Sequence, residues 1–129
     1  MYAITTTPGF VIDSRPYGDA GKIVSIFTRD LGLIMVTAQG IRLEKSKLRY
    51  FTQDFSWGVY SLVRGKEFWK LTSAAELSLQ ANLPQDYNAL LARLAFLIRR
   101  LLQGEESHAE LFDCLLACAE FLSRTSSTP

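Results

Sequence analysis

The apolar residues of this 129-residue chain follow two different spacings, and the change between them falls near Pro84. Before about residue 80 the apolar runs are short, rich in β-branched and aromatic residues, and separated by glycines. Beyond Pro84 leucines recur every three or four residues. Short runs of β-formers are typical of strands, whereas the longer spacing is that of an amphipathic helix. The sequence therefore predicts an α+β chain with its strands first and its helices second.

Five short segments are predicted to be strands. Asp30 and Gly32 supply turn chemistry between the second and third of them, which predicts a hairpin. A glycine-containing loop at 64–67 predicts another between the fourth and fifth. Closure of five short strands into a small barrel would leave no exposed sheet edge. The five expected strands span residues 9–13, 22–28, 33–38, 55–63 and 68–74.

The fourth segment alternates clearly enough to predict its faces. Phe55, Trp57 and Val59 share one side of a strand with period two, and we expect that side to face the core. Tyr60 falls on the other side and is expected to point outward. Gly58 within the strand predicts a bend or a bulge.

Two helices are predicted after the strands. The first, over about 85–103, carries a broad leucine stripe, and Gly104 ends it. Ser107 and Glu110 form a capping box for the second helix. The expected organisation is a barrel over 1–80, a helical hairpin packed on it over 81–124, and a polar tail over 125–129. The two apolar stripes are Leu90, Leu91, Leu94, Leu97, Ile98, Leu101 and Leu102, then Leu111, Phe112, Leu115, Leu116, Ala119 and Leu122.

The chain offers little for metal or catalytic chemistry. Cys114 and Cys118 share one helix face and are expected to be buried thiols, because structural zinc needs four ligands and only His108 could add a third. No phosphate-binding glycine loop or paired carboxylates stand out. We expect neither an enzyme nor a cofactor or metal site.

The net charge of +1 hides a strong segregation. Residues 1–39 are balanced, residues 40–70 carry +4, and residues 71–129 carry −3. Such asymmetry predicts a polyanionic partner for the middle segment. No apolar run reaches the length of a membrane span and no secretory leader is visible, so we expect a soluble cytoplasmic protein.

Several ordered blocks resemble the RecO family of recombination mediator proteins. The first is "GFVIDSRPYGDAGKIVSIFTRDLGLIMVTAQGIR" at 9–42, followed by "KSKL" at 45–48 and "SAAEL" at 73–77. The segment "ELFDCLLACAEFL" at 110–122 is similar to the helical region that follows. The family often continues into more helix and a four-cysteine zinc site, and no such site is carried over here.

The resemblance implies an OB-type barrel, DNA repair and recombination, single-strand binding and annealing, and recombinase loading. It implies as partners single-stranded DNA, with double-stranded DNA as a further candidate, a RecR-like protein and the single-stranded DNA-binding protein. It also implies a bacterial cytoplasmic protein associated with the nucleoid.

The DNA-binding residues are predicted from charge and from the loops of such a barrel. Cations on a connecting loop can track phosphates without reading sequence, and aromatic rings beside them can stack on unpaired bases. Tyr60 and Trp69 are further stacking candidates if they face outward. The alternative function is a protein-interaction module that docks a repair partner without strong DNA binding. The predicted DNA-binding residues are Arg42, Lys45, Lys47, Arg49 and Tyr50, extended by Lys22, Arg64, Lys66 and Lys70.

Overall fold

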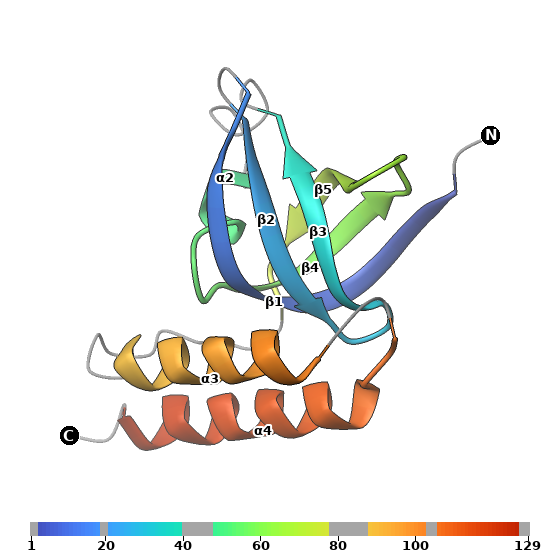
Figure 1. Ribbon diagram of the computed structural model, residues 1–129. Helices are drawn as coiled ribbons and strands as arrows, with labels where there is room; N and C mark the ends of the chain where they lie inside the picture. The colour runs from blue at the N-terminus through green and yellow to red at the C-terminus, as the bar shows by residue number, and fades with distance from the viewer. Residues whose placement is uncertain (1–2, 19–20, 40–47, 78–87, 103–105, 127–129) are drawn as a thin grey trace.

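The computed structural model describes residues 3–18, 21–39, 48–77, 88–102 and 106–126. Five strands form a closed barrel in the order β1-β2-β3-β5-β4, and two antiparallel helices lie beneath it (Figure 1). The predicted five-stranded OB-type barrel followed by a helical hairpin is therefore confirmed. The elements are β1 (Ile4–Tyr17), β2 (Gly21–Thr28), β3 (Gly32–Ala38), α2 (Leu48–Phe51), β4 (Trp57–Val63), β5 (Trp69–Ala75), α3 (Asn88–Leu101) and α4 (Ala109–Ser126).

Strand β1 is much longer than the predicted 9–13 because it serves two neighbours. Residues 4–10 pair antiparallel with β4, and residues 9–17 pair antiparallel with β2. The register shifts between Val11 and Asp13, which marks a bulge where the strand bends from one partner to the other. The first half of the strand, with Thr5, Thr6 and Thr7, is β-branched but contains no apolar run, so a prediction based on apolar runs missed it.

The barrel closes where β3 meets β5. These strands run parallel and share only the pairs Val36 with Trp69 and Thr37 with Lys70. The predicted hairpin of β2 and β3 is confirmed, with residues 29–31 as its turn. A second bulge lies in β4 between Ser61 and Leu62. The junction of β3 and β5 is thus the least extensively paired seam of the barrel.

The predicted faces of β4 were wrong. Gly58, Tyr60 and Leu62 point into the barrel, and Tyr60 and Leu62 are fully buried. Phe55 and Trp57 pack on the outside, against the cluster that the helices cover. Because the helices make that outer side apolar as well, alternation along β4 could not identify the inner face.

No bulge lies at Gly58, one of the two features predicted there, because the bulges of β1 and β4 lie between Val11 and Asp13 and between Ser61 and Leu62. Gly58 pairs with Gly9 across β4 and β1, and a Cβ at Gly58 would lie 3.1 Å from the ring of Tyr60 and 3.2 Å from that of Phe51. A Cβ at Gly9 would lie 2.7 Å from Ile26. The two glycines therefore make room for the large Tyr60 side chain inside a small barrel.

Two hydrophobic cores hold the molecule together. One fills the barrel and includes Val24, Ile26 and Tyr60. The other lies between the barrel and the helices, where Phe10 and Phe27 meet Phe112 and the buried residues of α3. Because α3 and α4 cover apolar side chains on the barrel's outer surface, the hairpin is an integral layer of the fold.

Only part of each predicted helical stripe is buried. Leu91, Ala95 and Ile98 of α3 and Phe112 of α4 pack in the core between the barrel and the helices, and Ala119 of α4 is also buried. The expected burial of Cys114 and Cys118 was wrong, since both are exposed. Helix α4 also continues to Ser126, into the predicted polar tail. The large apolar residues of the helices that remain exposed are Leu90, Phe96, Leu97, Leu101, Leu111 and Phe121.

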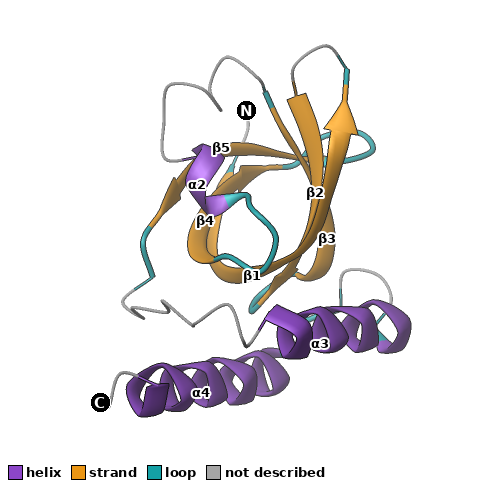
Figure 2. Ribbon diagram, turned by 90° about the vertical axis from the view of Figure 1, so that its left-hand side faces the viewer, coloured by secondary structure: helices purple, strands orange, loops and turns teal. Residues whose placement is uncertain are grey.

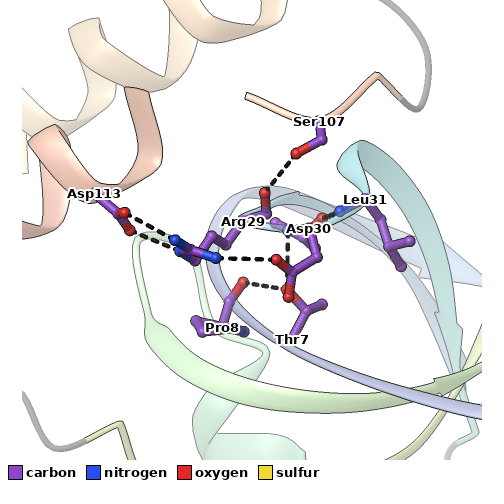
Figure 3. Close-up of polar contacts among 8 residues, drawn as sticks. Thr7, Pro8, Arg29, Asp30, Leu31, Ser107 and Asp113 are labelled. Atoms are coloured by element: carbon purple, nitrogen blue, oxygen red, sulfur yellow. Dashed lines mark hydrogen bonds and ion pairs between the residues drawn. The ribbon is translucent and has the colours of Figure 1, made fainter. Parts of the chain in front are cut away.

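The turn between β2 and β3 fastens α4 to the barrel (Figure 3). The Arg29 guanidinium donates to both carboxylate oxygens of Asp113, at 2.9 and 3.1 Å. These hydrogen bonds lower the pKa of Asp113 below its usual range. The hydroxyl of Ser107, predicted to cap the helix, donates instead to the Arg29 carbonyl at 3.1 Å, and the helix begins at Ala109. The predicted capping box was wrong because a tertiary contact uses the serine.

An ion pair between Arg99 and Asp13 joins α3 to β1 in the same way. His108 precedes α4, and its carbonyl accepts from the Phe112 amide at 3.0 Å. Within the described ranges no helix is both long and apolar enough to cross a membrane.

Candidate nucleic-acid interface

The structure divides the predicted DNA-binding residues into separate groups. Three of them, Arg42, Lys45 and Lys47, lie outside the described residues. Figure 1 places α2, which carries Arg49 and Tyr50, on one side of the barrel and the β4–β5 turn on the other. The described cations therefore do not form one continuous cluster. The β4–β5 turn and the strand that follows it hold Arg64, Lys66 and Lys70.

Helix α2 presents Arg49 and Tyr50 to solvent because its other two residues are buried. Leu48 and Phe51 insert into the barrel core. The buried Tyr60 hydroxyl donates to the Phe51 carbonyl at 2.6 Å, which fixes the end of the helix. Tyr50 is 61% exposed, and its ring meets Phe51 edge to face at 4.9 Å. Figure 2 shows α2 against the barrel, well away from α3 and α4.

Lys22 has a structural role in this arrangement. It shares the inward face of β2 with Val24 and Ile26, and its Nζ donates to the Thr52 carbonyl at 3.1 Å. Burial lowers the pKa of Lys22, a shift that Asp54 opposes and Arg49 reinforces. The ammonium group tethers the segment after α2 to the barrel and is turned away from the outer surface.

A groove opens on the outer surface where β3, β5 and the end of β4 meet. Its volume is about 410 Å³. Strand alternation turns Thr37 and Lys70 outward there, while Val36 and Trp69 point into the core. The limited pairing of β3 with β5 leaves this part of the surface hollow. We call it the β4–β5 groove; it is lined by Thr37, Gln39, Val63, Arg64, Lys70, Leu71 and Thr72.

Two cations of the predicted set line the β4–β5 groove. The Arg64 guanidinium lies 5.0 Å from the centre of the Trp69 ring, a cation–π arrangement that leaves its orientation defined. Lys70 projects from the neighbouring strand, and both side chains are exposed. The turn between them adds exposed Lys66 and Glu67. The surface around the groove is positive on balance.

The predicted stacking residues differ most from what the structure shows. Tyr60 and Trp69, proposed as outward stacking residues, are buried, and that prediction was wrong. Tyr50 is exposed as proposed. Tyr17 was missed, although it is 49% exposed and its ring contacts Phe68 beside the β4–β5 turn. Its place after an arginine and a proline at a strand end was the only sequence signal for it.

The exposed cations of this arrangement are suited to binding an anion. Guanidinium and ammonium groups on a rigid strand edge can each hold a phosphate oxygen, with arginine able to do so through two parallel hydrogen bonds. Such contacts position a backbone and do not read bases. In the part of the chain that the structure describes, no group of three or more His, Cys, Asp or Glu side chains is placed to hold a metal ion.

Comparison with known proteins identifies the family. Residues 1–78 match the family model described as "Recombination protein O N terminal". The chain belongs to the RecO family. The matched region covers the whole barrel, including the basic segment and the β4–β5 groove.

Curated RecO proteins match the helices as well as the barrel. The DNA repair protein RecO of Alkaliphilus metalliredigens is 30% identical over 84% of this chain and 45% of its own length. The corresponding values for Klebsiella pneumoniae are 32%, 93% and 49%, and for Gloeothece citriformis 32%, 83% and 38%. The chain thus spans half or less of the length of these RecO relatives.

Proposed function

We propose that this RecO-family chain acts in DNA repair and recombination by binding single-stranded DNA through its barrel. In this proposal the protein is a mediator that anneals strands and helps to load recombinase, and it works by binding and not by catalysis. The names of its relatives support the repair role. The observation that carries DNA binding is the β4–β5 groove, where Arg64 and Lys70 line one hollow from adjacent strands.

The physical basis is the release of counterions from the nucleic acid. Each phosphate that a cation neutralises frees condensed ions, so affinity falls as salt rises. Lys70 is paired with Val63, and Arg64 directly follows Val63, so little of their backbone freedom is lost on binding. The basic segment with Arg42, Lys45, Lys47 and Arg49 is proposed as a second stretch of the same phosphate path.

Loss of the two groove cations is expected to weaken binding of every sequence alike. In the double variant Arg64→Gln with Lys70→Gln, we expect affinity for a single-stranded oligonucleotide to fall about tenfold at low salt. The slope of log affinity against log salt should become shallower by about 1.4, because two phosphate contacts are gone. Fluorescence anisotropy at several salt concentrations measures both quantities.

A matched control removes the same charge elsewhere. Arg93 and Arg100 are exposed on α3, and changing both to glutamine should leave the affinity within about twofold. Equal loss in the two double variants would mean that net charge, and not the groove, governs binding.

A second experiment tests the basic segment by charge reversal. The affinity of the triple variant Lys45→Glu, Lys47→Glu and Arg49→Glu is measured by the same anisotropy titration at several salt concentrations. If the folded triple variant kept its full affinity for the oligonucleotide, the basic segment would not belong to the proposed phosphate path.

A second candidate function is supported by the exposed apolar edge of the hairpin. Leu90, Leu97 and Leu101 follow one another along α3 at helical spacing, and Leu101 is 75% exposed. Phe121 on α4 is 60% exposed. Contiguous apolar surface of this kind is typical of a protein interface. We propose that a RecR-like protein docks on this edge; the single-stranded DNA-binding protein stays a further predicted partner.

Charge placed on this edge is expected to weaken docking of the RecR-like protein and to leave DNA binding unchanged. The variant Leu97→Asp with Leu101→Asp should weaken binding of the RecR-like protein from the same genome at least tenfold in calorimetry, because the carboxylates would be buried at the interface. The control, Ala89→Asp with Ala92→Asp, adds equal charge to the polar side of the same helix and should bind normally. Unchanged binding in the leucine variant, or self-association of the chain through this edge in light scattering, would contradict the proposal.

A further inference from the structure

Tyr17 lies at the end of β1, where one side of its ring contacts Phe68 and the rest is exposed to solvent. The ring centroid lies 5.8 Å from that of Phe68, and the two planes meet at 74°. Phe68 is itself half-buried, so it holds the tyrosine from one side. Gly18, which follows with a φ of 69°, turns the chain away from the strand. Almost half of the Tyr17 surface nevertheless remains exposed.

The Phe68 contact places this ring against the β4–β5 turn, whose flanking residues Arg64 and Lys70 line the β4–β5 groove. The β4–β5 turn folds tightly, since a Cβ on Gly65 would lie 2.2 Å from the Phe68 carbonyl oxygen and 3.7 Å from Cε of Lys70. Lys70 and Arg64 both line the groove. Tyr17 therefore contacts, through Phe68, the same turn that joins the two groove cations Arg64 and Lys70.

Other exposed aromatic rings of the described residues lie elsewhere. Tyr50 also meets a phenylalanine edge to face, but it lies on α2 across the barrel. Phe96 and Phe121 belong to the helices. Tyr60 and Trp69 are inside the barrel. Among the exposed rings of the described residues, Tyr17 is thus the one that contacts the β4–β5 turn.

We infer that Tyr17 stacks on an unpaired base of a strand whose phosphates lie along Arg64 and Lys70. This inference rests on the proposed DNA binding and specifies its substrate. Phosphate contacts do not distinguish single strands from duplexes, because both present the same charged groups. A ring can stack only on a base that is not enclosed in a duplex. Tyr17 therefore gives the groove its preference for single strands.

The test compares Tyr17→Leu with Tyr17→Phe. Leucine keeps apolar packing on Phe68 but removes the flat ring, whereas phenylalanine keeps the ring. We expect Tyr17→Leu to lose roughly 5- to 100-fold in affinity for a single-stranded oligonucleotide and less than about twofold for a duplex, with the salt slope unchanged. Tyr17→Phe and the control Phe96→Leu should bind both like the original protein.

A spectroscopic measurement tests the stacking directly. An oligonucleotide of 2-aminopurine and thymine reports stacking through a change in fluorescence on binding. The original protein and Tyr17→Phe should both produce this change at saturation, and Tyr17→Leu should not. Thermal unfolding of each variant confirms that it is folded under the conditions used.

The outcomes separate this inference from the proposed function. Absence of salt-dependent binding in the original protein would overturn both. Salt-dependent binding that Tyr17→Leu retains in full, with the same 2-aminopurine response, would overturn the stacking role alone. Equal losses in Tyr17→Leu and Tyr17→Phe, or equal losses for single strands and duplexes, would likewise overturn it, because they would assign the effect to the hydroxyl or to the fold.

Discussion

Replacing Phe112 with alanine is expected to lower the free energy of unfolding by about 3–5 kcal/mol. Phe112 is fully buried between the barrel and the helices. Its ring packs edge to face on Phe27 and on Trp57, each with centroids 5.7 Å apart. Truncation removes these contacts and leaves a cavity among side chains that come from both layers, which can relax only partly. A chain of this size has roughly 6–19 kcal/mol of total stability, so the loss is large.

Phe121→Ala provides the matched control on the same helix. Its side chain is largely exposed, and its truncation should cost less than about 1 kcal/mol. Urea unfolding followed by tryptophan fluorescence measures both variants, since Trp57 lies at the affected interface and Trp69 lies in the barrel. Similar small losses for Phe112→Ala and Phe121→Ala would show that α4 does not depend on Phe112 for its contact with the barrel.

The second large loss of stability is expected at Gly32, where the end of the β2–β3 turn packs against the backbone of Glu106 in the segment before α4. Gly32 has a φ of 75°, and an added Cβ would lie 2.2 Å from the Glu106 carbonyl oxygen. Gly32→Ala must therefore accept a left-handed backbone conformation at roughly 1–2 kcal/mol and also displace a backbone segment. We expect a total loss of about 2–4 kcal/mol.

Gly18→Ala separates the two contributions. Gly18 has a φ of 69°, but a Cβ there would meet no atom within 4 Å. It should lose only the conformational part, about 1 kcal/mol. The difference between the two variants then measures how tightly the Glu106 segment is held on the turn. Equal shifts in their unfolding midpoints would contradict the close packing of these two segments.

The type and order of most elements could be predicted because they depend on local patterns. The change in hydrophobic spacing near Pro84 separated strands from helices correctly, and Asp30 with Gly32 marked a turn that forms. The leucine stripes of the last third do form helices. Each of these features depends on residues that are close together in the sequence, so the sequence alone is enough to predict it.

The direction of a side chain could not be predicted from sequence where a strand or helix end has possible contacts on more than one side. Trp57 faces the helices and Tyr60 faces the barrel, because both sides of β4 have apolar neighbours. Ser107 bonds to the Arg29 carbonyl instead of capping its helix, since the β2–β3 turn lies within reach. These choices depend on partners that are distant along the chain.

The candidate site shows the same division. Segregated charge predicts that the middle of the chain meets a polyanion, and this stays a prediction; Arg64 and Lys70 of that segment line one groove. Charge could not show that Lys22 points inward to the Thr52 carbonyl, or that Tyr17 meets Phe68. The alternation of side chains along β2 and the closure of the barrel determine the direction of Lys22 and the contact of Tyr17 with Phe68.

By itself the sequence determined which segments extend, which coil into helices and where positive charge accumulates, because propensity, spacing and charge are properties of nearby residues. The tertiary structure alone decided which of those residues share a surface. Closure of the barrel sets the strand register, and register together with the covering helices determines whether each side chain meets solvent, the core or another element.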